Sequence, residues 1–173
     1  MSSIVLVGFM GTGKTTTGKL LAKRLNREFL ELDEIIEKKE GISIREIFEK
    51  KGEPYFREIE RNVIREVMHK KEVVMSAGGG AIVDEENLRN LKKNGVVVCL
   101  EASPEVILKR TEGILTRPLL NVTDSKKKIE ELLKKRKACY KKADFCIDTN
   151  NLSAEEAVEE IARLSSRWVK RVL

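Results

Sequence analysis

Short apolar runs alternate along this chain with stretches in which apolar residues recur at helical spacing. The runs cover residues 4–7, 29–33, 73–76, 96–100 and 145–148. Near-continuous apolar character over this length is typical of strands that are buried on both faces of a parallel sheet. The alternation therefore predicts an α/β fold, in which a five-stranded parallel sheet is flanked by helices on both faces.

Helix boundaries are marked by capping and breaking residues. Ser43 with Glu46, and Ser153 with Glu156, have the spacing of capping boxes, so a helix is expected to begin at each serine. A glycine ends the first of these helices, and Pro54 then opens a longer one that we expect to reach about residue 70.

The chain's length and segment pattern suit a single domain. It has 173 residues, without an internal repeat or a low-complexity linker. Residues 111–124 follow neither the helical nor the strand period, which indicates a loop of functional length. No run of about eighteen apolar residues and no signal-peptide layout is present, so we expect a cytoplasmic protein without a membrane partner.

Composition excludes some classes of function. The net charge is +6, but lysine and arginine are interspersed with acidic residues and aromatic residues make up only 5%. We therefore expect no nucleic-acid partner, since a small anionic substrate explains the basicity equally well. His69 is the only histidine, which excludes a multi-histidine metal site. The three cysteines form no C-x-x-C pair and are interpreted as reduced structural thiols.

The charged fraction is unusually high. Charged residues make up 36% of the chain, above the quarter or so that is usual for soluble domains. This excess suggests ion-pair networks and a heat-adapted source.

The most informative stretch is IVLVGFMGTGKTT near the start of the chain. From Gly8 to Thr15 it matches the phosphate-loop pattern G-x-x-x-x-G-K-[ST] with its spacing intact. Gly8, Gly11 and Gly13 lie where a Cβ would obstruct a backbone that turns its N–H groups toward phosphate. Lys14 is expected to reach the β- and γ-phosphates of ATP, and the Thr15 hydroxyl to ligate the Mg²⁺ that bridges them.

Further candidate residues lie at predicted strand ends or on a neighbouring helix. Alternation along the second strand would put the carboxylates of Glu31 and Asp33 on one side, about 6–7 Å apart, although the pair could simply cap the next helix. Arg57 could clamp a carboxylate, or it could be a solvated or ion-paired residue. The glycines at 78–80 leave room for a small molecule or form an ordinary turn. Because ligands bind beyond the carboxyl ends of parallel strands, we expect these residues to converge on the phosphate loop.

Several short motifs follow one another along the chain: GFMGTGKTT, the acidic strand end before an Ile-Ile-Glu helix, G-x-S-I-x-x-I-F, GE-x-x-F-R-x-x-E, the triple glycine, T-R-P-L-L and K-R-x-x-x-Y. In this order they resemble the shikimate kinases. The resemblance implies a three-layer P-loop NTPase fold with a mobile lid. One kinase domain would span residues 1–173, with its core at 1–110 and 125–173, the lid at about 111–124 and a shikimate-binding segment at about 33–61.

The resemblance also implies an activity and roles for individual residues. The reaction would transfer the γ-phosphoryl group of ATP to the 3-hydroxyl of shikimate, a step in making aromatic amino acids. Asp33 would contact that hydroxyl and orient or deprotonate it. Lys14 and the lid residue Arg117 would neutralise charge on the transferring group. Arg57 and Arg136 would grip the shikimate carboxylate, in a pocket lined by Gly78, Gly79 and Gly80.

The nucleotide site follows from the same resemblance. It would contain Gly11, Thr12, Gly13, Lys14, Thr15, Thr16, Arg110 and Arg117. Arg110 and residues 149–151 are similar to the family's adenine-contacting segments. The metal ligands would be Thr15 and, through water, Glu31, a position at which the family commonly has aspartate.

Other activities fit the same phosphate loop. A gluconate kinase or a nucleoside monophosphate kinase has a comparable size and would differ only in its acceptor. A nucleotide-dependent switch would need neither the carboxylate-gripping arginines nor the glycine pocket. For either kind of kinase we expect a monomer that binds small molecules.

Overall fold

The structure, a computed structural model, describes residues 2–111 and 125–172, with the backbone alone for residues 167–172. The strands are β1 (Ser3–Val7), β2 (Phe29–Glu31), β3 (Val74–Ser76), β4 (Gly95–Glu101) and β5 (Phe145–Asp148). The helices are α1 (Lys14–Leu25), α2 (Leu32–Glu40), α3 (Ile44–Val67), the 3-10 helix η1 (Ala81–Val83), α4 (Glu85–Asn94), α5 (Pro104–Thr111), α6 (Ser125–Tyr140) and α7 (Ala154–Val172).

The strands form one parallel sheet in the order β2-β3-β1-β4-β5. β1 lies at its centre, where Val5 pairs with Met75 of β3 and with Val97 of β4. The predicted five-stranded parallel sheet is therefore confirmed.

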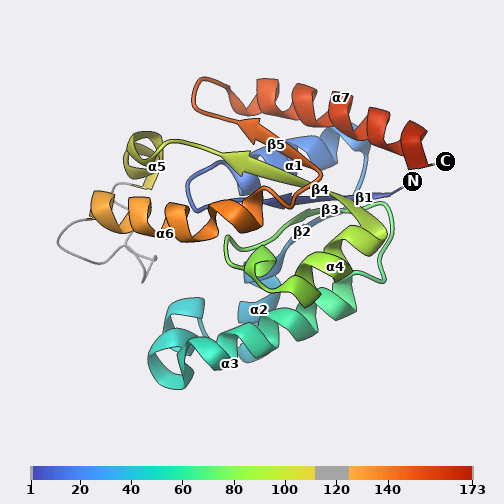
Figure 1. The fold of residues 1–173 in the computed structure, drawn as a ribbon. Coiled ribbons are helices and arrows are strands. Elements are labelled where there is room, and N and C mark those ends of the chain that lie inside the picture. Colours follow the sequence, from blue (N-terminus) through green and yellow to red (C-terminus); the bar gives the residue numbers. More distant parts are fainter. Residues whose placement is uncertain (1, 112–124, 173) are drawn as a thin grey trace.

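Helices cover both faces of the sheet (Figure 1). Ile4 and Leu6 belong to the core cluster beneath α1 and α7, whereas Val5 and Val7 belong to the cluster beneath α2, α3, α4 and α6. This alternation is the period-two geometry of a strand that is buried on both sides. It explains why the predicted strands at residues 4–7 and 96–100 show no alternation of apolar and polar residues.

The topology brings the ends of three strands together. The chain leaves β1 into the phosphate loop at the middle of the sheet, β2 and β3 lie on one side of β1, and β4 lies on the other. A position at which neighbouring strands connect in opposite directions is the usual place for a ligand in an open parallel sheet. The carboxyl ends of β1, β2 and β3 therefore define the candidate site.

β2 is shorter than the sequence predicts. It ends at Glu31, and α2 begins at once with Leu32, so that Asp33 lies in the first turn of a helix. Leu32 is buried in the core at 1% exposure and anchors that turn. The predicted alternation of Glu31 and Asp33 along one strand is therefore wrong.

The predicted capping boxes are confirmed. Ser43 Oγ accepts the Glu46 N–H, and the Glu46 carboxylate accepts the Ser43 N–H. Ser153 and Glu156 exchange the same two bonds before α7. α3 is continuous except at Gly52, where φ of 82° and ψ of 167° interrupt the helix at the predicted break. It ends at Val67, short of the predicted end near residue 70.

The predicted lid, apart from Thr111 at the end of α5, falls on residues 112–124 and lies outside the described residues together with Arg117. Among the helices that are described, none is long and apolar enough to cross a membrane.

Candidate active site

The loop between β1 and α1 has the backbone that its glycine spacing predicts. Gly8, Gly11 and Gly13 have φ values of 136°, 75° and 94°, which side-chain-bearing residues rarely adopt. A Cβ at Gly8 would also lie 2.2 Å from the carbonyl oxygen of Leu100. Gly13 immediately precedes α1, so the positive end of the helix dipole faces the loop. This geometry suits a phosphate group.

Side chains of the loop bond to the loop itself. Thr12 Oγ1 donates to the Phe9 carbonyl at 2.7 Å, and Lys14 Nζ donates to the same carbonyl at 2.9 Å. The Lys14 ammonium therefore lies against the turn, where it adds positive charge to the helix N-terminus.

A hydroxyl and a carboxylate meet beside Lys14. Thr15 Oγ1 donates to Glu31 Oε2 at 2.7 Å. Burial raises the pKa of Glu31 above its ordinary value, and the hydroxyls of Thr15 and Ser76 oppose that rise. Ser76 Oγ is buried and has no hydrogen-bond partner of normal geometry within the described residues. Oxygen donors with one unsatisfied hydroxyl fit a hydrated Mg²⁺, and the residues that would hold it are Thr15 and Glu31.

Asp33 faces the triple glycine from the start of α2. A Cβ at Gly78 would lie 3.4 Å from Asp33 Oδ1 and 3.3 Å from Glu60 Oε1. Asp33 and Glu60 therefore lie against the same peptide, although they come from different helices. The predicted convergence of the acidic residue and the glycines is observed.

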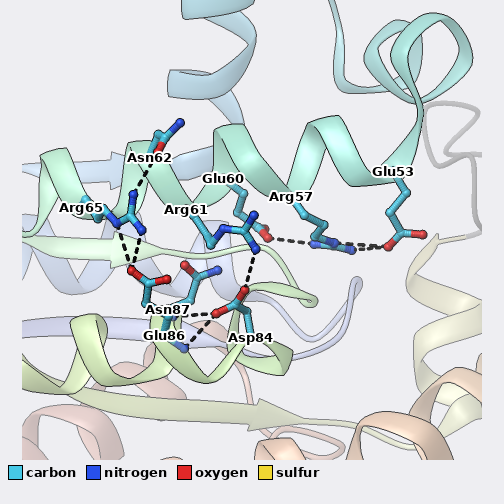
Figure 2. Close-up of polar contacts among 9 residues, drawn as sticks. All are labelled: Glu53, Arg57, Glu60, Arg61, Asn62, Arg65, Asp84, Glu86 and Asn87. Atoms are coloured by element: carbon cyan, nitrogen blue, oxygen red, sulfur yellow. Dashed lines mark hydrogen bonds and ion pairs between the residues drawn. The ribbon is translucent and has the colours of Figure 1, made fainter.

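Arg57 approaches the same glycines from α3. Its guanidinium donates to Glu60 Oε2 at 2.9 Å and to Glu53 Oε1 at 3.0 Å, so that the side chain is held from both sides (Figure 2). A Cβ at Gly80 would lie 2.5 Å from Arg57 Nη1, and glycine is needed there for the guanidinium to fit. Arg57 is therefore ion-paired, which was one of the two alternatives to a carboxylate clamp, and its role as a clamp stays a prediction.

α6 contributes Arg136 and Tyr140 to the opposite wall of this pocket. The Arg136 guanidinium carbon lies 5.6 Å from the centre of the Phe9 ring, within cation–π range of the phosphate loop. A Cβ at Gly79 would lie 3.4 Å from Arg136 Nη1 and 3.3 Å from the Tyr140 hydroxyl. That hydroxyl donates to the Gly79 carbonyl at 2.8 Å. The two arginines thus lie against adjacent glycines of one turn, Arg136 at Gly79 and Arg57 at Gly80.

A cavity lies beside the phosphate loop. It has a volume of about 350 Å³ and is lined by Gly11, Thr12, Gly13, Thr16, Thr17, Arg110, Thr149, Leu152, Ser153, Ala154 and Ala157. Arg110 Nη2 donates to the Thr149 carbonyl at 2.8 Å, and Arg110 Nη1 donates to the Thr149 hydroxyl at 3.1 Å. The segments predicted to contact adenine therefore meet beside the phosphate loop.

Sequence reasoning assigned no role to Glu60 and Tyr140. Both stood within the recognised strings GE-x-x-F-R-x-x-E and K-R-x-x-x-Y, at helical spacing from Arg57 and Arg136. A carboxylate three residues after an arginine, or a tyrosine four residues after one, shares that arginine's helix face. This helical spacing is visible in the sequence, but the contacts of Glu60 and Tyr140 with the glycine turn depend on the tertiary fold.

Comparison with known proteins agrees with this geometry. Residues 10–165 match the family model described as shikimate kinase. A shikimate kinase from Thermodesulfovibrio yellowstonii is 50% identical over 94% of this chain and 94% of its own length. One from Caldanaerobacter subterraneus subsp. tengcongensis is 45% identical over 94% of this chain and 95% of its own.

Solved structures give the same result. The shikimate kinase from Acinetobacter baumannii in complex with shikimate superposes with a TM-score of 0.91, at 43% identity over 95% of this chain and 92% of that one. The chain therefore belongs to the shikimate kinase family of ATP-dependent phosphotransferases.

Proposed function

We propose that this chain transfers the γ-phosphoryl group of ATP to the 3-hydroxyl of shikimate. One observation carries the assignment within the family: Asp33, Arg57 and Arg136 all reach the glycine turn at 78–80, which lies beside the phosphate loop. An acid and two carboxylate-binding cations around one turn suit an acceptor that carries both a hydroxyl and a carboxylate. The shikimate bound to the Acinetobacter baumannii relative supports the same acceptor.

Arg57 and Arg136 would hold the shikimate carboxylate, and this contact sets the orientation of the ring. Arg57 is already restrained by Glu53 and Glu60, so little side-chain entropy remains to be lost when the acceptor binds. Asp33, which lies against Gly78, would accept a hydrogen bond from the reacting hydroxyl and orient the oxygen of that hydroxyl for attack. Alignment of this kind is the main contribution that a protein makes to phosphoryl transfer.

The donor would be held by the phosphate loop. The backbone N–H groups around Gly11 and Gly13 would bind the β-phosphate, and Lys14 would exchange its bond with the Phe9 carbonyl for one with the phosphates. Thr15 and Glu31 would hold Mg²⁺, which supplies neutralising charge to the phosphate oxygens when it is bound. Arg110 would contact the adenine, and Arg117 would approach the transferring group as the lid closes and excludes water.

The decisive experiment is a coupled assay of ADP formation with purified full-length chain and Mg-ATP. Shikimate is expected to stimulate ADP formation strongly, whereas gluconate and nucleoside monophosphates are not. Stimulation by one of those compounds instead would identify a different kinase. Nucleotide binding without any acceptor-dependent turnover would support a switch.

Two variants separate the proposed roles. Asp33→Asn should lower kcat by about a hundredfold or more, with little change in the dissociation constant of ADP, because it removes the group that meets the hydroxyl. Arg136→Ala should raise the KM for shikimate about tenfold to a hundredfold, the loss expected for one charge-assisted contact. Equal turnover in Asp33→Asn would remove this residue from the chemistry.

A further inference from the structure

Two cysteines that are far apart in sequence meet on neighbouring strands at one end of the sheet. Cys99 of β4 and Cys146 of the edge strand β5 are directly paired in the parallel register. Residues paired in this way point to the same face of the sheet, and so does Glu101, two positions beyond Cys99. The two sulfur atoms and a carboxylate oxygen of Glu101 all lie within 4.8 Å of one another, the one such group of three within residues 2–111 and 125–172.

The group extends from the interior to the surface. Cys99 is fully buried, whereas Cys146 and Glu101 are exposed. Beside it lies a cavity of about 470 Å³ between α6 and the ends of β4 and β5, with Glu101 and Tyr140 in its wall. Glu101 lines this cavity and Cys146 is exposed, so two of the three donors are open to an ion, and the buried Cys99 sulfur lies within 4.8 Å of both.

The donor set is that of a thiophilic cation. Zinc and its heavier analogue cadmium bind thiolate and carboxylate together, and two thiolates on one tetrahedral zinc lie about 3.8 Å apart. Sulfur atoms that already lie within 4.8 Å need only small rotamer changes to reach that spacing. We propose that Cys99, Cys146 and Glu101 form a binding site for one Zn²⁺-like thiophilic cation, outside the phosphotransfer site.

Binding would release protons. Burial raises the pKa of both the Cys99 and the Cys146 thiols, so that each carries its proton at neutral pH. When the cation binds, each S–H bond breaks, the proton passes to the buffer, and the sulfur forms a bond to the metal. No oxidant or reductant takes part. The carboxylate of Glu101 supplies the third ligand, and water or buffer can complete the tetrahedron.

The site lies next to the proposed acceptor pocket. Cys146 Sγ now donates to the Tyr140 carbonyl at 3.7 Å, and the Tyr140 hydroxyl bonds to Gly79. A cation would deprotonate Cys146 and remove its bond to the last residue of α6. It would also tie the edge strand β5 to β4.

The test is a titration of the reduced full-length chain with Cd²⁺ in excess Mg²⁺, which occupies sites made of carboxylates alone. We expect one Cd²⁺ per chain, a thiolate-to-cadmium charge-transfer band, and release of two thiol protons per ion. Cys146→Ser should weaken binding by at least about tenfold and reduce the band, and Glu101→Gln should weaken binding less. Both substitutions are at exposed positions, so the fold should tolerate them.

Cys139 provides the matched control, because it is the remaining cysteine and is not part of the group. Cys139→Ser should bind Cd²⁺ as the wild type does. The proposal is wrong if the wild type gives no charge-transfer band at one equivalent. It is also wrong if Cys139→Ser loses the band while Cys146→Ser keeps it.

Discussion

Glu60 is a buried acid whose environment disfavours its charge. The residue is 1% exposed, and burial raises its pKa although Arg57 and, more weakly, Arg136 oppose the rise. A carboxyl with a raised folded-state pKa stabilises the fold fully below its ordinary value of 4.5, and this stability is lost as pH rises through the folded value. At neutral pH the raised pKa of Glu60 therefore costs stability, while its carboxyl group restrains the Arg57 guanidinium.

Glu60→Gln should separate these two effects. The amide still accepts a hydrogen bond from Arg57 but carries no charge, so the thermal midpoint at pH 7 should equal or exceed that of the wild type. Because a neutral acceptor holds the guanidinium less firmly, the KM for shikimate should rise about tenfold. The stability advantage of the variant should shrink as pH falls toward 4.5. A variant that is less stable at pH 7 and unchanged in KM would contradict this account.

The Tyr140 hydroxyl fixes the orientation of the Gly79 peptide from α6. Burial raises the pKa of Tyr140 to about 12, so the hydroxyl remains a donor throughout the working range. Tyr140→Phe removes its bond to the Gly79 carbonyl and its interaction with Arg136, and we expect kcat to fall about twofold to tenfold. The nucleotide dissociation constant should not change, since the phosphate loop keeps its own hydrogen bonds.

Tyr55 offers a control for that substitution. Its hydroxyl bonds to Glu40 and Lys51 between α2 and α3, away from the glycine turn. Tyr55→Phe should leave kcat unchanged. Equal losses in the two variants would show that the effect of Tyr140→Phe is a general loss of stability.

Sequence alone could predict the residues whose chemistry is fixed by local spacing. The phosphate loop is such a case, because Gly8, Gly13, Lys14 and Thr15 belong to one turn. Asp33 was also identified, but on a wrong geometric argument, since it begins a helix and does not continue a strand. The Glu60 and Tyr140 contacts join segments that are distant in the chain, and no local pattern specifies them.

At the scale of elements, the three glycines after β3 form a surface on which α2, α3 and α6 meet. The atoms that an added Cβ would meet differ between these positions. A Cβ at Gly80 would lie 2.5 Å from the end of the flexible Arg57 side chain, whereas a Cβ at Gly79 would lie 2.9 Å from the backbone oxygen of Gly8. The first obstacle can move aside and the second cannot.

Gly80→Ala and Gly79→Ala should therefore have different effects. Gly80→Ala should fold normally and raise the KM for shikimate about tenfold, because it displaces Arg57 and leaves the phosphate loop intact. Gly79→Ala should weaken the binding of both ATP and shikimate, because the added Cβ would displace the backbone of the phosphate loop at Gly8. Steady-state kinetics with each substrate varied in turn would distinguish them. Identical kinetic profiles for the two variants would contradict this division.

α4 is tied to α3 through its N-cap. Asp84 accepts the backbone N–H groups of Glu86 and Asn87 and also bonds Arg61 of α3 at 3.0 Å (Figure 2). Partial burial of Asp84 raises its pKa, but these hydrogen bonds outweigh burial and leave it below the ordinary value of 3.8. The stability from this carboxylate is therefore present above pH 3.8 and is lost as pH falls through the folded value.

Asp84→Ala should lower the free energy of unfolding by about 1 kcal/mol at pH 7, the usual cost of losing a cap. Asp84→Asn keeps a capping oxygen but loses the charge, so its cost should be smaller. Denaturant titrations at several pH values would measure both. The difference between the wild type and Asp84→Ala should narrow below pH 3.8. A difference that widens there would show that the carboxylate is not the source of the effect.

The sequence predicted the boundaries of elements that begin or end at a capping or breaking residue, but it did not predict boundaries that lack such a residue. The capping boxes of α3 and α7 fixed their first residues, and the break at Gly52 followed from its position before Pro54. The boundary between β2 and α2 has no glycine, proline or capping hydroxyl to mark it. Burial of Leu32 decides that boundary, and this depends on the core formed by other segments.

For the whole molecule, the number of strands could be predicted, but their order could not. Apolar runs specify strands locally, whereas the order β2-β3-β1-β4-β5 depends on pairings between runs far apart in the chain. The pairing of Cys99 with Cys146 is a direct consequence of that order. It explains how two cysteines that share no sequence motif come to lie side by side.

The high charge content is organised into ion pairs between elements. Arg65 of α3 bonds Glu86 of α4, and Lys92 of α4 pairs with Asp144 just before β5 at 2.9 Å. A single exposed pair contributes little at room temperature, but networks gain importance on heating because the desolvation penalty of charges falls. The sequence-based expectation of ion-pair networks is thus consistent with the described part of the chain.

We expect a thermal midpoint above about 65 °C, the upper end of the usual mesophilic range. Raising NaCl to about 1 M shortens the screening length to about 3 Å and should lower that midpoint. Glu86→Gln breaks the contact with Arg65 and should reduce the sensitivity to salt, whereas Asn62→Ala beside it should not. A midpoint in the ordinary mesophilic range, with no dependence on salt, would mean that these ion pairs serve solubility and not heat stability.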